Sequence, residues 1–142
     1  VADGVAFLAD KQNEYDVILI DSSDPIGIGE GLFNRAFYKT AFDALKPDGI
    51  LTAQTDGTFP EHSTIARVYP IFKELFPIVN CYHGHIPTYP GGLWTWSFCS
   101  KQYQPKIADQ ARYEKIAVTC KYYNQDIHTG AFLLPQFLSN LV

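Results

Sequence analysis

Two carboxylates three residues apart are the strongest candidates for chemistry in this sequence. Asp21 and Asp24 belong to the segment DSSDP at residues 21–25, which directly follows the apolar run YDVILI at residues 15–20. Paired acids in such a place can bind an amine or accept a proton. They can also be structural, because Asp often caps a helix and Asp-Pro is common in turns. The local pattern alone leaves both interpretations open.

The residues around these acids predict alternating strands and helices. A continuous apolar run with β-branched residues, as at 15–20, is typical of a strand buried on both faces of a parallel sheet. We expect helices over residues 5–13, 32–45, 62–76, 111–118 and 131–141, strands over 15–20 and 50–54, and a strand pair over 80–86 and 94–100. This order predicts an α/β fold, the second half of a Rossmann-like doubly wound sheet, mostly parallel with an antiparallel strand pair at the end.

The predicted sheet indicates where a ligand would bind. In open α/β sheets, ligands lie outside the carboxyl ends of the strands. Residues 21–24 follow one strand, and Asp3-Gly4 would follow another if Val1-Ala2 end a strand. We therefore expect the functional site to include these two acid-bearing loops.

Composition excludes several classes of protein. The net charge of −4 lacks the basic footprint that nucleic-acid binding needs, and no apolar run approaches the ~20 residues of a membrane span. The odd number of cysteines, three, with no CxxC spacing favours free thiols in a reducing cytoplasm. His83-Gly84-His85 could share a metal ion, but no further ligand is placed to complete the site, so we expect no metal.

Three separate motifs stand out along the chain: DSSDPIG at 21–27 continuing as EGLF at 30–33, IPTYPGGLW at 86–94, and KYYNQDIH at 121–128. These motifs, in this order, resemble the spermidine synthases. Two further features, Asp3-Gly4 and Gln54, fall at compatible spacings. The resemblance covers essentially the whole chain.

The resemblance implies an enzyme that transfers an aminopropyl group from decarboxylated S-adenosylmethionine, a co-substrate, to putrescine, giving spermidine and methylthioadenosine. No separate cofactor is implied. Residues 1–142 would form the C-terminal part of a class I methyltransferase-type catalytic domain, without its N-terminal β domain and Gly-rich nucleotide loop. The resemblance also implies a cytoplasmic homo-oligomer, a dimer or tetramer, and we expect the isolated chain to be inactive.

The resemblance assigns a role to each matched residue on the amine side. Asp21 would accept the proton and help to bind putrescine, and Asp24 would hold the remote ammonium. Gln54 would lie near that ammonium, and Tyr89 would line the methylene chain. The structural alternatives are a strand-end amide for Gln54 and an ordinary core residue for Tyr89. Trp94 and Trp96, on one face of a strand, are interpreted as core or subunit interface rather than as a cation–π cage.

On the donor side, Asp3 and Gly4 would meet the adenine, and Ile28 would lie against the adenosine. Asp3-Gly4 could instead be a plain turn. The pattern departs from the family at Ile28-Gly29, where Pro-Ala is usual, and at Asp56, which adds an acid near the remote-amine end or points outward.

Three other functions remain open from sequence. The same scaffold serves putrescine N-methyltransferases, which use ordinary S-adenosylmethionine. A different acceptor, such as agmatine, is a second possibility. A non-catalytic subunit is the third, although the retained acids at 21 and 24 argue against it.

Overall fold

A four-stranded mixed sheet forms the centre of the molecule. The computed structural model describes residues 3–23, 25, 27–57, 63–89, 91–105 and 109–142. The strand order is β1-β2-β4-β3, with β1 parallel to β2 and with β4 antiparallel to both of its neighbours. Three of the four strands therefore run in one direction, and the predicted fold class is confirmed. The strands are β1 Tyr15–Ile20, β2 Leu45–Gly57, β3 Ile78–His85 and β4 Leu93–Ser100.

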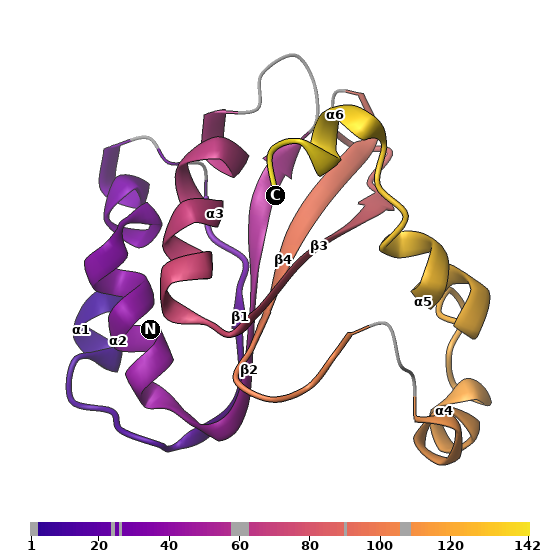
Figure 1. The fold of residues 1–142 in the computed structure, drawn as a ribbon, viewed down its shortest axis with the longest axis horizontal. Helices are drawn as coiled ribbons and strands as arrows, with labels where there is room; N and C mark the ends of the chain where they lie inside the picture. The colour runs from indigo at the N-terminus through magenta and orange to yellow at the C-terminus, as the bar shows by residue number, and fades with distance from the viewer. Residues whose placement is uncertain (1–2, 24, 26, 58–62, 90, 106–108) are drawn as a thin grey trace.

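Helices lie on both sides of this sheet (Figure 1). The first group covers one face, and α5 contacts β3 from the other side. The first group is α1 Gly4–Leu8, the 3₁₀ helix η1 Gly27–Phe33, α2 Arg35–Ala44 and α3 Ser63–Leu75, and the second is α4 Gln110–Ala117 and α5 Gln125–Ala131. The last helix, α6 Gln136–Ser139, buries Leu138 in the same core as the first group. In the part of the chain that the structure describes, no helix is long and apolar enough to cross a membrane.

Several element boundaries differ from the sequence prediction. Helix α2 begins at Arg35 rather than at residue 32, because the Asn34 side chain accepts a hydrogen bond from the Phe37 amide at 2.9 Å and caps the helix. Strand β2 takes in residues 46–49, where a turn was expected. The helix predicted over residues 131–141 is wrong: Pro135 lies between α5 and α6, and proline cannot continue a helix from the preceding turn.

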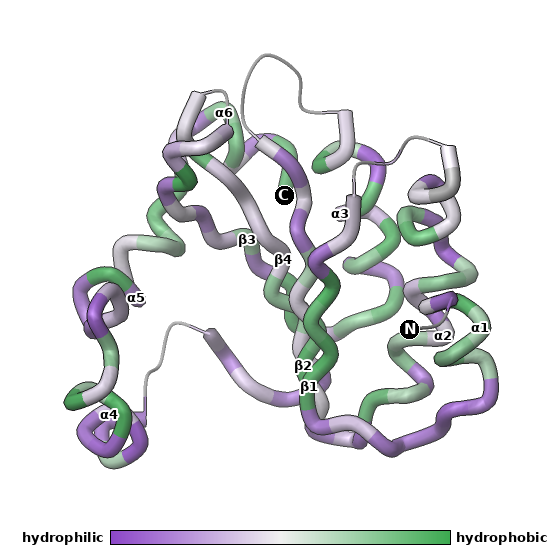
Figure 2. Tube along the Cα trace, turned by 180° about the vertical axis from the view of Figure 1, so that it is seen from behind, coloured by the Kyte–Doolittle hydropathy of each residue, from purple (hydrophilic) through white to green (hydrophobic). Residues whose placement is uncertain are grey.

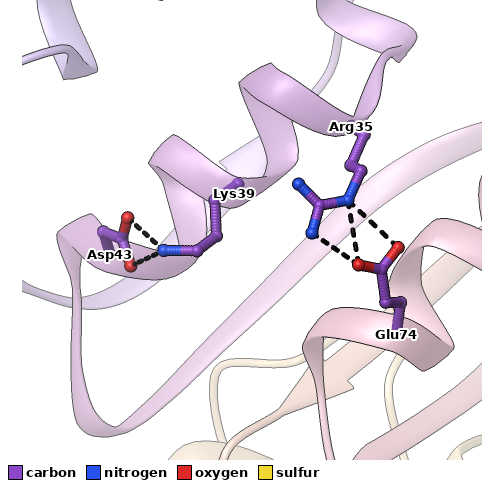
Figure 3. A network of polar contacts seen from close by, with 4 residues as sticks. All are labelled: Arg35, Lys39, Asp43 and Glu74. Atoms are coloured by element: carbon purple, nitrogen blue, oxygen red, sulfur yellow. Dashed lines mark hydrogen bonds and ion pairs between the residues drawn. The ribbon is translucent and has the colours of Figure 1, made fainter.

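The core lies between the sheet and the first group of helices. Tyr38 of α2 and Phe72 of α3 meet edge to face with ring centroids 4.6 Å apart, and both are fully buried. At the solvent side of the same helices, Arg35 donates to Glu74 at 2.9 Å (Figure 3). The two helices therefore form one rigid layer behind the strands whose ends carry the candidate acids.

Strand β1 is not buried on both faces, contrary to the sequence prediction. Val17 is 49% exposed and Leu19 is 72% exposed. Among the described residues β1 pairs only with β2, and helices cover one of its faces. Figure 2 shows this strand as largely hydrophobic. The apolar pattern therefore marks a surface that a globular protein would normally cover.

We expect the isolated 142-residue chain to self-associate through this strand, because an exposed apolar edge strand offers unpaired backbone groups to a second chain. Size-exclusion chromatography with light scattering over a range of concentrations measures this. Leu19→Lys should shift the chain toward monomer. Leu133→Lys, at a side chain of similar exposure (70%), is the control and should not. A wild-type chain that stays monomeric at high concentration would contradict the prediction.

Candidate active site

A cavity of about 810 Å³ opens at the carboxyl ends of β1 and β2. Because these strands are parallel, their ends meet at one edge of the sheet, and the loop between β3 and β4 closes the far side. Three residues predicted from sequence meet there: Asp21, Gln54 and Tyr89. The full lining is Leu19, Ile20, Asp21, Ser22, Ser23, Thr52, Gln54, Asp56, Gly57, Tyr82, Ile86, Tyr89, Trp94 and Trp96.

The charged residues described in this lining are all acidic. Asp21 and Asp56 are acidic, and no Lys or Arg belongs to the described residues that line the cavity. Carboxylates without a competing cation attract a cationic ligand, and the attraction grows where water is excluded. The cavity therefore suits an amine rather than an anion.

Asp21 stands between two cavities. It follows the last residue of β1, where its exposed side chain is free of the sheet. It lines the 810 Å³ cavity and also a neighbouring cavity of about 410 Å³, to which Gly4 and Leu32 contribute. A single carboxylate at this junction can contact two ligands, one bound on each side.

Gln54 holds the edge of the site together. Its side chain is 4% exposed and all of its described hydrogen bonds are internal. The Nε2 atom donates to the Ser22 carbonyl at 3.1 Å, while Oε1 accepts from the Asp56 amide at 2.9 Å and from Trp94 Nε1 at 3.3 Å. These partners fix the amide orientation, because a carbonyl only accepts and an N–H only donates. Gln54 thus joins the loop after β1 to β2 and β4.

Asp56 faces the cavity rather than outward. Its backbone has a φ of +83°, in the left-handed region that a non-glycine residue seldom adopts. The side-chain carboxylate accepts hydrogen bonds from the Gly57 amide at 2.6 Å and from Thr64 Oγ1 at 3.1 Å. The backbone carbonyl of Asp56 accepts one from Thr95 Oγ1 at 2.8 Å. Such a conformation persists only when its surroundings hold it, and residues held this way are common at functional sites.

Aromatic rings form the other wall of the cavity. Tyr89 lies in the loop between β3 and β4 with its ring centroid 4.4 Å from that of Trp94, and Tyr82 stacks on Trp96 at 5.5 Å. Trp94 and Trp96, interpreted from sequence as core or subunit interface, are half-buried and both line the cavity. Their shared strand face was visible in the sequence. The sequence did not reveal that this face of the strand lines the cavity.

The residues that the resemblance assigns to the donor lie in different places in the structure. Asp3 caps α1, and its Oδ1 accepts from the Val5 amide at 2.8 Å and from the Ala6 amide at 3.1 Å. Gly4 lines the smaller cavity, as Asp21 does. Ile28 belongs to η1, and its side chain lies outside the described part of the structure. Asp24 lies outside the described residues.

Histidines and cysteines do not build a further reactive centre in the described part of the chain. No group of three or more His, Cys, Asp or Glu side chains there could hold a metal ion. All three cysteines are free thiols. Burial raises the pKa of Cys81 to about 11, which keeps its thiol protonated and poorly nucleophilic at neutral pH.

The fold and site together define an α/β protein with an acidic, aromatic-walled cavity at the carboxyl ends of its parallel strands. Residues 1–111 match the family model of the spermine/spermidine synthase domain. The chain is 42% identical over 142 residues to a polyamine aminopropyltransferase of Caldicellulosiruptor bescii and 44% identical to one of Shouchella clausii. These matches take in 100% of this chain but only 50% and 51% of the relatives. The chain thus spans about half the length of the curated relatives it matches.

Solved structures agree with the sequence relatives. A spermidine synthase in complex with the transition-state analogue AdoDATO superimposes with a TM-score of 0.92 at 38% identity, covering 99% of this chain and 48% of that one. The Thermotoga maritima spermidine synthase gives 0.86 at 35% identity, covering 99% and 46%. The chain belongs to the spermine/spermidine synthase family, as its motifs predicted.

We expect Gln54→Ala to lower the free energy of unfolding, because it removes three hydrogen bonds and leaves their partly buried partners unsatisfied. Unsatisfied buried groups cost roughly 1–3 kcal/mol each. Chemical denaturation of the full-length protein measures the change. Gln102→Ala, the same substitution at an exposed residue, is the control. Equal stabilities for the two variants would mean that the Gln54 network does not hold the site together.

Proposed function

We propose that this chain is the amine-binding and proton-accepting part of a polyamine aminopropyltransferase that acts on putrescine. The observation that carries the proposal is the 810 Å³ cavity with Asp21 and Asp56 in its lining and with Tyr89 and Trp94 as an apolar wall. A diamine presents two cationic ends joined by methylenes. Carboxylates suit its ends, and aromatic faces suit both its methylenes and its cations. The family supports the same ligand class.

The reaction requires a neutral amine as the nucleophile. An alkylamine resembles Lys, whose pKa is about 10.4, so at neutral pH it arrives protonated. The sulfonium of a donor bound next to it would lower the amine pKa by charge repulsion, and Asp21 at the junction of the two cavities is the base in reach of the proton.

Group transfer then follows in one displacement. The amine nitrogen forms a bond to the donor methylene beside the sulfonium, the carbon–sulfur bond breaks, and its electron pair goes to sulfur, giving the neutral thioether methylthioadenosine. Gln54 and Asp56 fix the pocket walls, so the amine and the methylene are held in line rather than meeting by diffusion.

The donor would occupy the side of Asp21 that Gly4 lines. Decarboxylated S-adenosylmethionine ends in a propylammonium, whereas S-adenosylmethionine also carries a carboxylate there. Asp21 attracts the first and repels the second, so that one residue discriminates between the two donors. The remaining donor contacts would come from a part of the protein outside this chain.

An assay of the full-length protein tests this function. Purified protein is incubated with putrescine, agmatine or cadaverine and with either donor, and the products are identified by mass spectrometry. We expect an aminopropylated putrescine from the decarboxylated donor. A methylated amine from S-adenosylmethionine would instead indicate a putrescine N-methyltransferase, and no product with any pair would support a non-catalytic subunit.

We expect Asp21→Asn in the full-length protein to lower kcat by roughly 10²–10⁴-fold, the usual effect of removing a general base. Initial rates at neutral pH, with circular dichroism to confirm folding, measure it. Asp10→Asn is the control, because this acid is 81% exposed and lines none of the cavities described above. A variant at Asp21 that keeps most of its activity would rule out this carboxylate as the base.

We expect Tyr89→Ala to raise the KM for the diamine more than it lowers kcat, because its ring contacts the unreacting methylenes. Asp24→Asn should behave in the same way if that acid holds the remote ammonium. Tyr103→Ala is the control, a tyrosine of similar exposure whose hydroxyl donates to Asp48 outside the cavity. A collapse of kcat with unchanged KM would show that these residues act on the reacting end.

A further inference from the structure

Asp56 is the acid of the 810 Å³ amine cavity that stands apart from the donor side. Of the two acids described in the lining of this cavity, only Asp21 also borders the smaller cavity, and Asp56 lines the amine cavity alone. The last residue of β1, Ile20, pairs with Ala53 of β2, so Asp56 lies three residues further along β2 than the end of β1. A diamine whose reacting end lies at Asp21 would therefore present its other ammonium to Asp56.

Two buried threonines hold the backbone of Asp56. Its carbonyl accepts a hydrogen bond from Thr95 Oγ1 at 2.8 Å, and Thr95 Oγ1 lies 2.9 Å from Thr55 Oγ1. Because a carbonyl only accepts, the Thr95 proton goes to Asp56, and Thr55 donates to Thr95. Both threonines are fully buried. These bonds secure the left-handed φ of +83°, but they do not fix the side-chain torsions of Asp56.

The orientation of the Asp56 carboxylate depends on a different threonine. Thr64 Oγ1 donates to Oδ2 at 3.1 Å, and the Gly57 amide donates to Oδ1 at 2.6 Å. One donor on each oxygen fixes the plane of the carboxylate, which has about four acceptor sites and can still accept from an ammonium. Thr64 is 3% exposed and does not line the cavity. Its hydroxyl therefore acts on the cavity through Asp56.

The elements that carry these contacts lie away from the exposed face of β1. Thr64 belongs to α3, which buries Ile65 and Val68 in the core. Strand β2 has a paired strand on each side. The described hydrogen bonds to the carboxylate and carbonyl of Asp56 come from β2, α3 and β4. The arrangement around Asp56 therefore does not depend on what covers Val17 and Leu19 in the full-length protein.

We propose that Thr64 is a positioning residue for the acceptor, whose hydroxyl holds the Asp56 carboxylate in the orientation that receives the remote ammonium of the diamine. A carboxylate that is already ordered loses little freedom when the ligand arrives, so more of the attraction between the charges contributes to affinity. This inference rests on the proposed function, because it assumes that a diamine binds in the 810 Å³ cavity. Loss of the hydroxyl should weaken the binding of an amine that carries a second ammonium, and of no other.

The test compares putrescine with butylamine, which has the same four carbons but only one amine. Dissociation constants are measured by calorimetry on full-length protein in the presence of methylthioadenosine, with butylamine titrated in competition with putrescine. Thr64→Val keeps the approximate shape of the side chain and removes the hydroxyl. It should weaken putrescine binding by roughly two- to tenfold, the scale of ordering one free side chain on binding, and leave butylamine unchanged. Thr64→Ser keeps the hydroxyl and should restore the wild-type affinity.

Thr40→Val is the matched control, because the Thr40 hydroxyl lies on α2 and donates to the Ala36 carbonyl of its own helix at 3.0 Å. It should change neither affinity. If thermal unfolding shows that Thr64→Val does not fold, Thr64→Ala replaces it.

A double-mutant cycle shows whether Thr64 acts through the carboxylate. In an Asp56→Asn background, Thr64→Val should cause little further loss of putrescine affinity, because the group that it positions no longer carries a charge. An equal loss for both amines, a full additional loss in the Asp56→Asn background, or no loss with either amine would overturn the inference and reduce Thr64 to a packing residue of α3.

The proposed function can fail separately from this inference. Wild-type protein that binds putrescine but transfers no aminopropyl group would refute the reaction, while the calorimetric comparison of the two amines would still decide the role of Thr64. Wild-type protein that transfers the group but binds putrescine no better than butylamine would refute the inference alone. Wild-type protein that binds no diamine would refute both.

Discussion

The buried carboxamide of Gln54 is the contact on which the site depends. Parallel pairing of β1 and β2 brings their ends to one edge of the sheet, but it does not fix the loops that leave those ends. The hydrogen bonds of Gln54 do so, because they join Ser22, Asp56 and Trp94 through one buried group. Three chain segments distant in sequence are therefore held as one wall.

Strain and charge are concentrated at the same place. Asp56 keeps a left-handed backbone and an acidic side chain in the lining because Gly57, Thr64 and Thr95 satisfy its polar atoms. The cost of this conformation is offset by these hydrogen bonds, which come from β2, α3 and β4. A negative pocket can therefore be kept ready for a cation without first reorganising around it.

The exposed apolar face of β1 and the span of the match both concern the borders of the candidate site. The chain covers about half of its relatives, and Val17 and Leu19 of β1 are exposed although strands of this composition are normally covered. The proposed reaction also needs a nucleoside donor, for which the smaller cavity beside Gly4 is the candidate site.

The sequence by itself determined the order of strands and helices and the family, because apolar periodicity and spaced motifs are local properties of the chain. The resemblance assigned Asp21, Gln54 and Tyr89 to one site, and the structure places all three in the lining of one cavity. Only the tertiary structure decided which face of β4 lines the cavity, and hence that Trp94 and Trp96 belong to it. Period-two alternation shows that two residues share a face but not what lies opposite. Likewise, only the packing of Thr64 and Thr95 around residue 56 turned Asp56 inward, because those partners lie 8 and 39 residues away in sequence.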